Sequence, residues 1–189
     1  MPPRIDLAVA MAYAVPLWIA VGLVGAIVVF VVVMTVLGSR LPEEHVASLT
    51  LWLGQRQQDV WDVIADIAAH KHWIRGITKI ERLPDRENRE VWRQHMGRDS
   101  LVLETTVFQP PAHLVRTVAD DRHMFSGDWE YVLSHGGEGT RVRLTEHGRV
   151  PNRFFRAMMR YVIGESSTIR RHLSSLAAKF GEKPRFENS

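Results

Sequence analysis

The sequence predicts an α+β domain in which one antiparallel sheet lies against a long C-terminal helix, with a transmembrane helix in front of it. Three patterns indicate this: an uncharged run at residues 7–37, short alternating segments divided by turn residues between 46 and 148, and apolar residues every three or four positions from 155 to 180. Short connections favour antiparallel pairs, because parallel strands need long crossovers. A sheet and a helix with one apolar face each bury those faces together, which is the α+β arrangement.

The uncharged run, Leu7–Leu37, is long enough to cross a membrane. A helix rises ~1.5 Å per residue, and ~20 apolar residues cross the hydrocarbon core of a bilayer. Pro16 suits the first turn of a helix, and Trp18 then lies near one interface. The apolar core of a signal peptide has only roughly 7–15 residues. We therefore expect a short tail at 1–6, a single-pass anchor at 7–38, and the membrane as one partner.

The charges that flank this run hardly decide its orientation. Arg4 lies before it and Arg40 after it, so the positive-inside rule gives almost no preference. We place the protein in the cell membrane and leave the side of the soluble domain open, with a slight preference for the cytoplasm. Residues 39–45 are predicted to form a polar linker between anchor and domain.

The composition excludes several classes of function. The chain has 189 residues, no cysteine and a net charge of +3, which rules out disulfides and thiolate sites and is too mild for a nucleic-acid binder. His70 and His72 are two apart and would face different sides of a helix. Neither an HExxH nor a G-x-S-x-G pattern occurs. We predict no metal, no cofactor, no nucleic acid and no hydrolase nucleophile.

The domain is predicted to begin with a strand and a helix. Residues 46–54 alternate apolar and polar side chains, which is typical of a strand. Val60, Ile64 and Ile67 fall on one face of a following helix, which Asp59 is predicted to cap. Six further strands are expected, which gives a sheet of about seven: residues 77–83, 90–96, 101–108, 114–120, 128–134 and 140–148.

The stretch "FSGDWEYVLSHGGEGTRVRLTEHG", residues 125–148, contains a glycine-rich turn that could hold a phosphate or simply join two strands. Alternating runs flank the glycines on both sides, as in a hairpin. A phosphate-binding loop instead leads from a strand into the N-terminus of a helix, and no Lys-Ser or Lys-Thr pair follows here. The pattern therefore predicts a hairpin.

A long helix, about Asn152–Phe180, is predicted to close the domain, with Gly181 as its stop and a disordered tail at 183–189. Arg153, Arg156 and Arg160 lie mostly away from its apolar face. They could rest on anionic headgroups, although we favour an ordinary solvated helix face.

The second half of the chain resembles bacterial proteins of the SRPBCC superfamily, which includes the START, birch-pollen-allergen-like and polyketide cyclase/dehydrase-like proteins. The matching features are Gly127 with Trp129, the "GGEGTRV" hairpin, "TEHG", and the helix containing "TIRRHLSSLAAKFG". Upstream, "VWDVIADIAAHKHW" and "FQPPAHLV" are similar to the first helix and the Pro-Pro turn of that family. The resemblance covers about residues 46–182. It implies a helix-grip fold, in which a curved sheet wraps around the C-terminal helix and encloses a pocket for a hydrophobic ligand.

The resemblance also suggests which residues form the pocket wall. Our candidates are Trp92, Met96, Trp129, Tyr131, Met158, Met159, Val162 and Ser166. The alternative is that these side chains pack into a closed core, which is the more common role of aromatic and methionine stripes.

These observations predict a membrane-anchored protein that binds or transfers a hydrophobic small molecule, such as a lipid, a quinone or a polyketide-like compound, without a covalent step. One alternative is a cyclase or dehydratase, with Glu104, His95 or Glu146 as acid or base. Another is an interaction module whose core is filled. No catalytic residue is assigned, because the enzyme hypothesis rests on analogy of fold.

Overall fold

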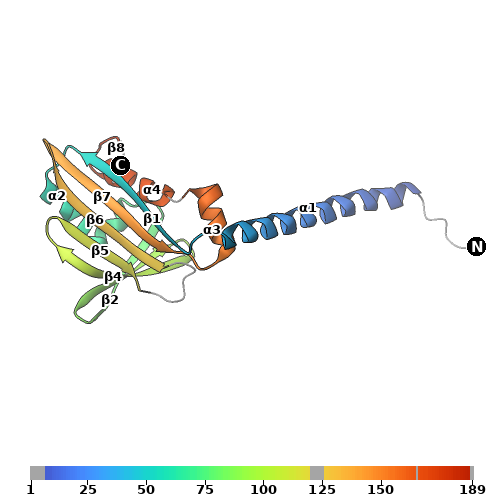
Figure 1. Ribbon diagram of the computed structural model, residues 1–189, viewed down its shortest axis with the longest axis horizontal. Coiled ribbons are helices and arrows are strands. Elements are labelled where there is room, and N and C mark those ends of the chain that lie inside the picture. The colour runs from blue at the N-terminus through green and yellow to red at the C-terminus, as the bar shows by residue number, and fades with distance from the viewer. Residues whose placement is uncertain (1–6, 120–125, 165, 188–189) are drawn as a thin grey trace, which may run out of the picture.

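The computed structural model describes residues 7–119, 126–164 and 166–187, with side chains from Trp18 onward. Helix α1 (Leu7–Ser39) projects from a domain made of one sheet and several shorter helices (Figure 1). It includes a stretch, Trp18–Ser39, that is long and apolar enough to cross a membrane. The predicted tail at 1–6, the last residue of the strand predicted at 114–120, the start of the hairpin at residue 125 and the chain end at 188–189 lie outside the described residues.

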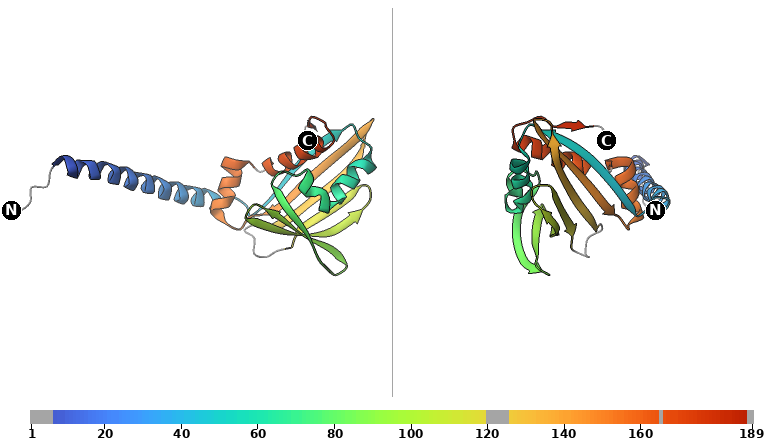
Figure 2. Two further views of the ribbon diagram at one scale, coloured as in Figure 1. Left: turned by 180° about the vertical axis from the view of Figure 1, so that it is seen from behind. Right: turned by 60° about the vertical axis from the view of Figure 1, so that its left-hand side comes forward.

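The domain contains the predicted antiparallel sheet, which is curved (Figure 2). Its spatial order is β2-β3-β4-β5-β6-β7-β1-β8, so the first strand of the domain closes onto the last long one. In the β1–β7 ladder Leu49 is paired with Leu144 and Ala47 with Glu146. The strands are β1 (Glu44–Leu53), β2 (Ile77–Arg86), β3 (Arg89–Met96), β4 (Asp99–Gln109), β5 (His113–Val118), β6 (Ser126–Gly136), β7 (Gly139–Arg149) and β8 (Arg185–Glu187).

Strand β8 corrects the prediction of a disordered tail at 183–189 for the described part of it, which ends at residue 187. Phe186 pairs with Leu51 at the edge of the sheet, and the guanidinium of Arg170 lies 4.6 Å from the centre of the Phe186 ring. A three-residue strand has no recognisable pattern of its own, because its pairing with β1 defines it.

Helix α2 (Gln57–Ala65) and the short 3₁₀ helix η1 (Ile67–His72) follow β1, as predicted. The predicted cap is wrong: Arg56 occupies the N-cap position, and Asp59 lies in the first turn, where its carboxylate accepts hydrogen bonds of 2.7 Å from the Arg56 guanidinium. Val60 and Ile64 are buried on the face predicted from their spacing.

The C-terminal helix is present but interrupted, which corrects the prediction of one continuous helix at 152–180. It consists of α3 (Arg153–Met158), a π-helical turn η2 (Met159–Ile163) and α4 (Ser167–Lys179). Gly164 separates the pieces with a φ of 88°, a backbone conformation that favours glycine. Because of this break only α4 packs on the sheet, and α3 turns towards α1 (Figure 1).

The core lies between α4, α2 and one face of the sheet. On the sheet, its side chains occupy alternate positions of β1, β6 and β7, which is the period of two that the sequence shows, together with Leu114 of β5. Each fully buried aliphatic or aromatic side chain contributes about 1.5–3 kcal/mol relative to its exposed state. The largest fully buried members are Tyr131, Leu51, Leu53, Ile64, Leu114, Leu144, Ile169, Leu173 and Leu176.

The segment between α1 and β1 is held to the domain by specific contacts. Arg156 is buried, and its Nη1 atom donates a 3.1 Å hydrogen bond to the Leu41 carbonyl and lies 3.8 Å from Glu43 Oε1. Arg149 also donates to Glu43, at 3.1 Å. The predicted linker at 39–45 is therefore held in place by the domain, and we call this segment the joint between anchor and domain. Its last two residues already belong to β1.

Candidate functional site

A cavity of about 470 Å³ lies between the sheet and the helices η1, α3, η2 and α4. Ligand pockets in proteins have volumes of ~300–1,000 Å³ and walls that are mostly apolar with a few polar groups. The cavity fits this description. Its apolar wall consists of Ile74, Ile77, Met96, Leu101, Leu103, Val118, Trp129, Tyr131, Val150, Phe155 and Met159.

One polar group in the wall is built by the two strands that close the sheet. Glu146 on β7 and His45 on β1 both line the cavity, and the His45 Nε2 atom lies 3.8 Å from Glu146 Oε1. His45 is paired with Gly148 in the ladder, and a Cβ atom at Gly148 would lie 2.1 Å from Cε1 of the imidazole. The glycine of the "TEHG" motif thus makes the room in which the His45 ring lies.

Glu146 has the electrostatics of a proton donor or acceptor near neutral pH. Burial raises the pKa of this carboxyl to about 7, while the indole of Trp129, its ladder partner, acts in the opposite direction to a smaller extent. Its Oε2 atom and the Nε2 atom of His45 are both buried without a hydrogen-bond partner. Buried polar atoms of this kind are uncommon in folded proteins, and both belong to residues that line the cavity.

A second polar group lies deeper, around Arg116 on β5. The residue is 5% exposed, and its guanidinium donates to the carbonyls of Ile64 and Ala65 at the C-terminus of α2, at 3.1 and 2.8 Å. No carboxylate of the described residues forms an ion pair with it, and burial lowers its pKa. The carbonyls at the helix end supply the compensating negative charge. Its Nε atom has no hydrogen-bond partner in the part of the chain that the structure describes.

His70 and Gln94 complete this group. The His70 ring lies 3.0 Å from the Ile64 carbonyl through Nε2 and 3.3 Å from Gln94 Nε2 through Nδ1. Burial, and then the charge of Arg116, hold the pKa of His70 well below its usual value. The ring is therefore neutral at neutral pH.

His172 on α4 contacts the two aromatic residues of the cavity wall, Trp129 and Tyr131. Its Nε2 atom lies 3.0 Å from the Tyr131 hydroxyl, and its ring meets Trp129 edge-to-face with centres 4.9 Å apart. Burial lowers the pKa of His172 to about 3. This neutral imidazole fixes the orientation of two of the predicted wall residues.

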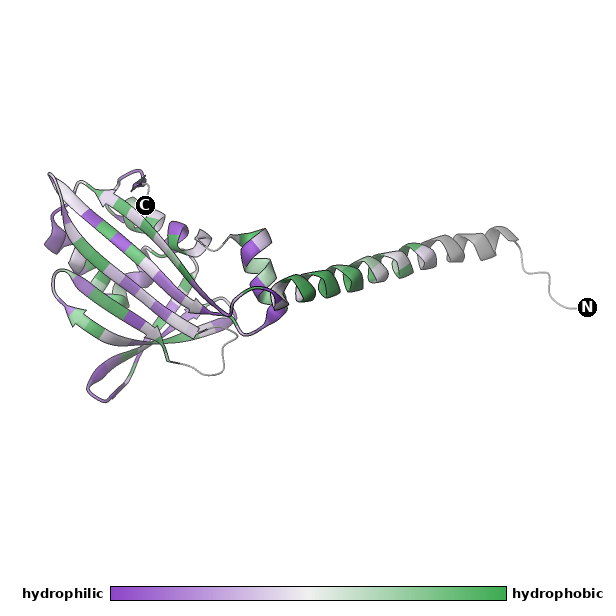
Figure 3. Cartoon of the chain, in the orientation of Figure 1, coloured by the Kyte–Doolittle hydropathy of each residue, from purple (hydrophilic) through white to green (hydrophobic). Residues whose placement is uncertain are grey.

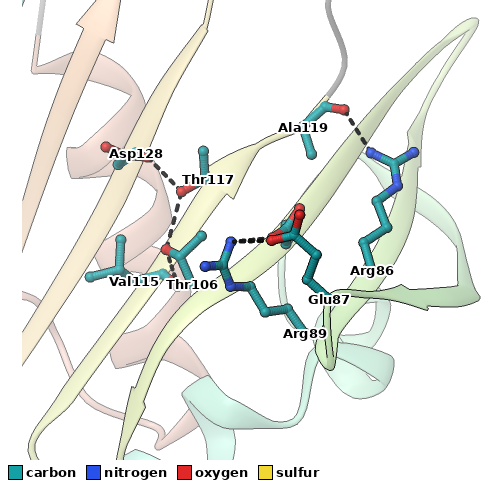
Figure 4. Close-up of polar contacts among 9 residues, drawn as sticks. Arg86, Glu87, Arg89, Thr106, Val115, Thr117, Ala119 and Asp128 are labelled. Carbon is teal, nitrogen blue, oxygen red and sulfur yellow. Dashed lines mark hydrogen bonds and ion pairs between the residues drawn. The ribbon is translucent and has the colours of Figure 1, made fainter.

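A row of polar side chains links the strands that carry this wall. Thr117 donates a 2.6 Å hydrogen bond to Asp128 Oδ1 and lies 3.2 Å from the Thr106 hydroxyl, which joins β4, β5 and β6 (Figure 4). Thr117 follows Arg116 on β5 and so projects from the opposite face of the strand. The row fixes the register from the side away from Arg116.

The structure brings four of the eight predicted wall residues together at the cavity: Met96, Trp129, Tyr131 and Met159. The other four lie elsewhere. Trp92 is under the Arg82 guanidinium, 5.2 Å from the ring centre, and Val162 and Ser166 are exposed. Met158 is half-buried on α3 and is absent from the wall, because the helix face that presents Phe155 and Met159 to the cavity points the neighbouring side chain elsewhere.

Of the three acid or base candidates, only Glu146 lines the cavity. Glu104 accepts a 2.9 Å hydrogen bond from Arg89, and His95 lies 3.0 Å from Glu81, and neither residue lines the cavity. Sequence reasoning missed His45 and Arg116. A signal for Arg116 existed, since it alternates with Leu114 and Val118 on an apolar strand face. Among the described residues no cluster of three or more His, Asp or Glu side chains could hold a metal ion.

The model of the family "Polyketide cyclase / dehydrase and lipid transport" matches residues 56–181. The chain belongs to this family. The domain has the START-like, SRPBCC fold that the sequence resemblance implied. Curated proteins gave no match.

Solved structures agree on the fold. The Zhui aromatase/cyclase from Streptomyces sp. R1128 has a TM-score of 0.56 at 16% identity, covering 72% of this chain and 93% of that one. A START superfamily protein from Mycobacterium smegmatis has a TM-score of 0.56 at 15% identity, covering 71% and 96%. The di-domain ARO/CYC StfQ of the steffimycin pathway has a TM-score of 0.56 at 9% identity, covering 73% and 52%. This chain aligns with about half the length of that di-domain protein.

Proposed function

We propose that the protein binds a hydrophobic small molecule in the cavity between sheet and helices, and that the chain is held at a membrane by α1. The observation that carries the proposal is the volume of about 470 Å³ with a mainly apolar wall and two separate polar groups. The described side chains leave this volume open, which favours a ligand over a filled interaction module. The description of the family, with its cyclases, dehydrases and lipid transport, supports the same class of ligand.

The polar groups narrow the chemistry of the ligand. Burial of apolar ligand surface is favourable by ~25 cal/mol per Å², which supplies affinity without fixing orientation. Glu146 and His45 on one wall, and Arg116 at the deep end, offer hydrogen bonds that an apolar chain or ring cannot use. The preferred ligand is therefore an extended apolar molecule with oxygen functions, as in a polyketide, a quinone or a fatty acid.

Native mass spectrometry of the full chain tests this proposal. The protein would be purified in detergent, released from the micelle in the gas phase, and compared with a Leu103→Trp variant that fills the cavity. Val132→Trp serves as a matched control, because Val132 is 40% exposed on β6 and does not line the cavity. We expect an organic-extractable adduct on wild type and control, and its loss in the cavity variant.

Two results would contradict the proposal. An adduct that persists unchanged in Leu103→Trp would be bound elsewhere. A wild-type chain that carries no adduct, and retains none after incubation with a panel of fatty acids, quinones and aromatic polyketides, would have no ligand of the expected class.

A second candidate function is acid–base catalysis on such a ligand, in the manner of a cyclase or dehydratase. The observation that favours it is the raised pKa of Glu146, because a carboxyl with a pKa near 7 can both give and take a proton at neutral pH. His45 at 3.8 Å is close enough to share that proton once a ligand bridges the two groups.

If this second function is correct, replacing Glu146 should abolish conversion of the ligand without abolishing its binding. With a β-hydroxy ketone as probe, the wild type should release one water from the bound molecule, whereas Glu146→Gln should bind the probe and leave it unchanged. Conversion at the wild-type rate in Glu146→Gln would exclude this residue as the acid or base and leave the binding function in place.

A further inference from the structure

We propose that the segment Arg153–Ile163, comprising α3 and η2, lies in the interface of the bilayer and turns one wall of the cavity towards lipid. The proposal rests on the proposed crossing of the membrane by α1. It adds a second membrane contact, made by the folded domain itself, and it names the route by which a hydrophobic ligand reaches the cavity.

The first observation is the exposed apolar surface of this segment. Tyr161, Val162 and Ile163 are consecutive and 57%, 60% and 49% exposed, and Phe155 is 37% exposed. The rest of the C-terminal helix behaves differently, since Ile169, Leu173 and Leu176 on α4 are fully buried. An aromatic ring with a hydroxyl beside two aliphatic side chains is a composition that suits the boundary between headgroups and hydrocarbon.

The second observation is the position of the segment relative to α1. The Phe154 ring meets the Phe30 ring edge-to-face with centres 6.2 Å apart. Gly38 approaches the backbone of α3 so closely that a Cβ atom would lie 1.7 Å from the Arg153 carbonyl oxygen. Met34, between these two contacts on the same helix face, is also buried. The segment is therefore fixed against the last two or three turns of α1, and α3 lies across its end (Figures 1 and 2).

The length of α1 sets the depth of this contact. The 22 residues Trp18–Ser39 span ~33 Å along a helix axis, against a hydrocarbon core of ~30 Å. The described part of this helix is apolar along most of its length (Figure 3). Phe30 lies nine residues before Ser39, so it is ~13 Å of helix from that end. A ring that touches Phe30 cannot be far from the hydrocarbon when α1 crosses the bilayer, and its helix is brought to the interface with it.

The third observation links this segment to the cavity. Phe155 and Met159 belong to α3 and η2 and also form part of the cavity wall. A molecule dissolved in the bilayer would then reach the cavity past these two side chains without crossing water. Arg153, exposed at the start of the segment, is placed to meet lipid phosphates. Arg156 is buried in the joint and takes no part in this contact.

The absence of cysteine from the chain makes the test direct, because single cysteines can carry a polarity-sensitive NBD fluorophore without background labelling. The full chain would be reconstituted in vesicles of phosphatidylcholine with a minority of phosphatidylglycerol. Val162→Cys reports on the segment and Val24→Cys on the middle of α1. Glu138→Cys, in the exposed turn between β6 and β7 far from α1, is the aqueous control (Figure 1). Tyr161→Cys is a second reporter on the segment.

We expect the reporters at 161, 162 and 24 to show blue-shifted emission, and nitroxide-labelled lipids to quench them several-fold more strongly than the reporter at 138. Iodide in the aqueous phase should show the reverse order. If 161 and 162 behave like 138 while 24 is quenched by lipid, the interfacial placement is overturned and the anchor stands. If the reporter at 24 also behaves like the reporter at 138, α1 does not cross the bilayer, and the inference is overturned together with the proposed anchor.

Discussion

A Cβ atom on Gly148 would lie 2.1 Å from Cε1 of His45, so the wall of the cavity accommodates the imidazole only because residue 148 has no side chain. The two residues are opposite each other in the β1–β7 ladder. The ring leans over the glycine towards Glu146, whose Oε1 atom is 3.8 Å away. One missing side chain thereby positions a potential proton-transfer pair.

The first prediction follows from this contact. Gly148→Ala should lower the free energy of unfolding by about 1–3 kcal/mol, because the added methyl group must displace the His45 ring or the strand. His45→Ala in the same chain should recover most of this loss, since the smaller side chain vacates the space. Urea unfolding of the four proteins of the cycle, followed by tryptophan fluorescence in detergent, measures the coupling. Additive effects of the two substitutions would show that the ring and the glycine do not compete for space.

The second prediction concerns the pH dependence of stability at Glu146. Its pKa is raised from 4.5 to about 7 on folding, so between these values the unfolded chain gives up the proton first and the folded state is destabilised as pH rises. Glu146→Gln has no such proton. The stability of the variant relative to wild type should therefore increase between pH 4.5 and 7 and then stay constant, with a total of roughly 3 kcal/mol. A relative stability that does not change with pH would mean that the carboxyl is not buried as described.

The sheet could be predicted from the sequence because the patterns that specify its strands and turns are local in the chain. Alternation in β1, β6 and β7, and glycines at the β6–β7 turn, specify strands and a hairpin whatever the rest of the chain does. The break in the C-terminal helix also had a local sign. Gly164 costs ~1 kcal/mol inside a helix, although the apolar spacing from 155 to 180 continues through it.

The cavity could not be predicted to the same extent, because its polar groups depend on pairing between distant segments. His45 belongs to the predicted linker at 39–45, and it reaches the site only through its pairing with Gly148. Glu146 has a polar neighbour on each side in the sequence, and only the closure of the sheet by β1 buries it. Val162 repeats the apolar spacing of the core residues on α4 but lies beyond the break, on the exposed segment.

The third prediction concerns His172 and the acid limit of stability. Burial lowers its pKa from 6.5 to about 3, so the stability contributed by the neutral ring is complete above pH 6.5 and is lost as pH falls towards 3. His172→Gln can still accept the Tyr131 hydrogen bond through its side-chain oxygen and cannot become charged. Relative to wild type, its stability should rise by roughly 3–5 kcal/mol from pH 7 to the acid limit. Parallel curves for the two proteins between pH 7 and 4 would contradict the burial of this ring.

The fourth prediction concerns the joint between anchor and domain. Arg156→Ala leaves the Leu41 carbonyl without its 3.1 Å hydrogen bond and Glu43 without one of its two guanidinium neighbours. A hydrogen bond from a charged group contributes ~1.5–3 kcal/mol, which corresponds to a tenfold to hundredfold change in the population of the open joint. Cleavage after Glu43 or Glu44 by a glutamate-specific protease should accelerate by that factor.

Arg153→Ala, three residues earlier on the same helix, is the control for this prediction. It removes an exposed side chain and should leave the rate of cleavage unchanged. Equal acceleration in both variants would indicate that α3 itself has loosened, and unchanged cleavage in Arg156→Ala would show that the tight approach of Gly38 to Arg153 is sufficient to hold the joint.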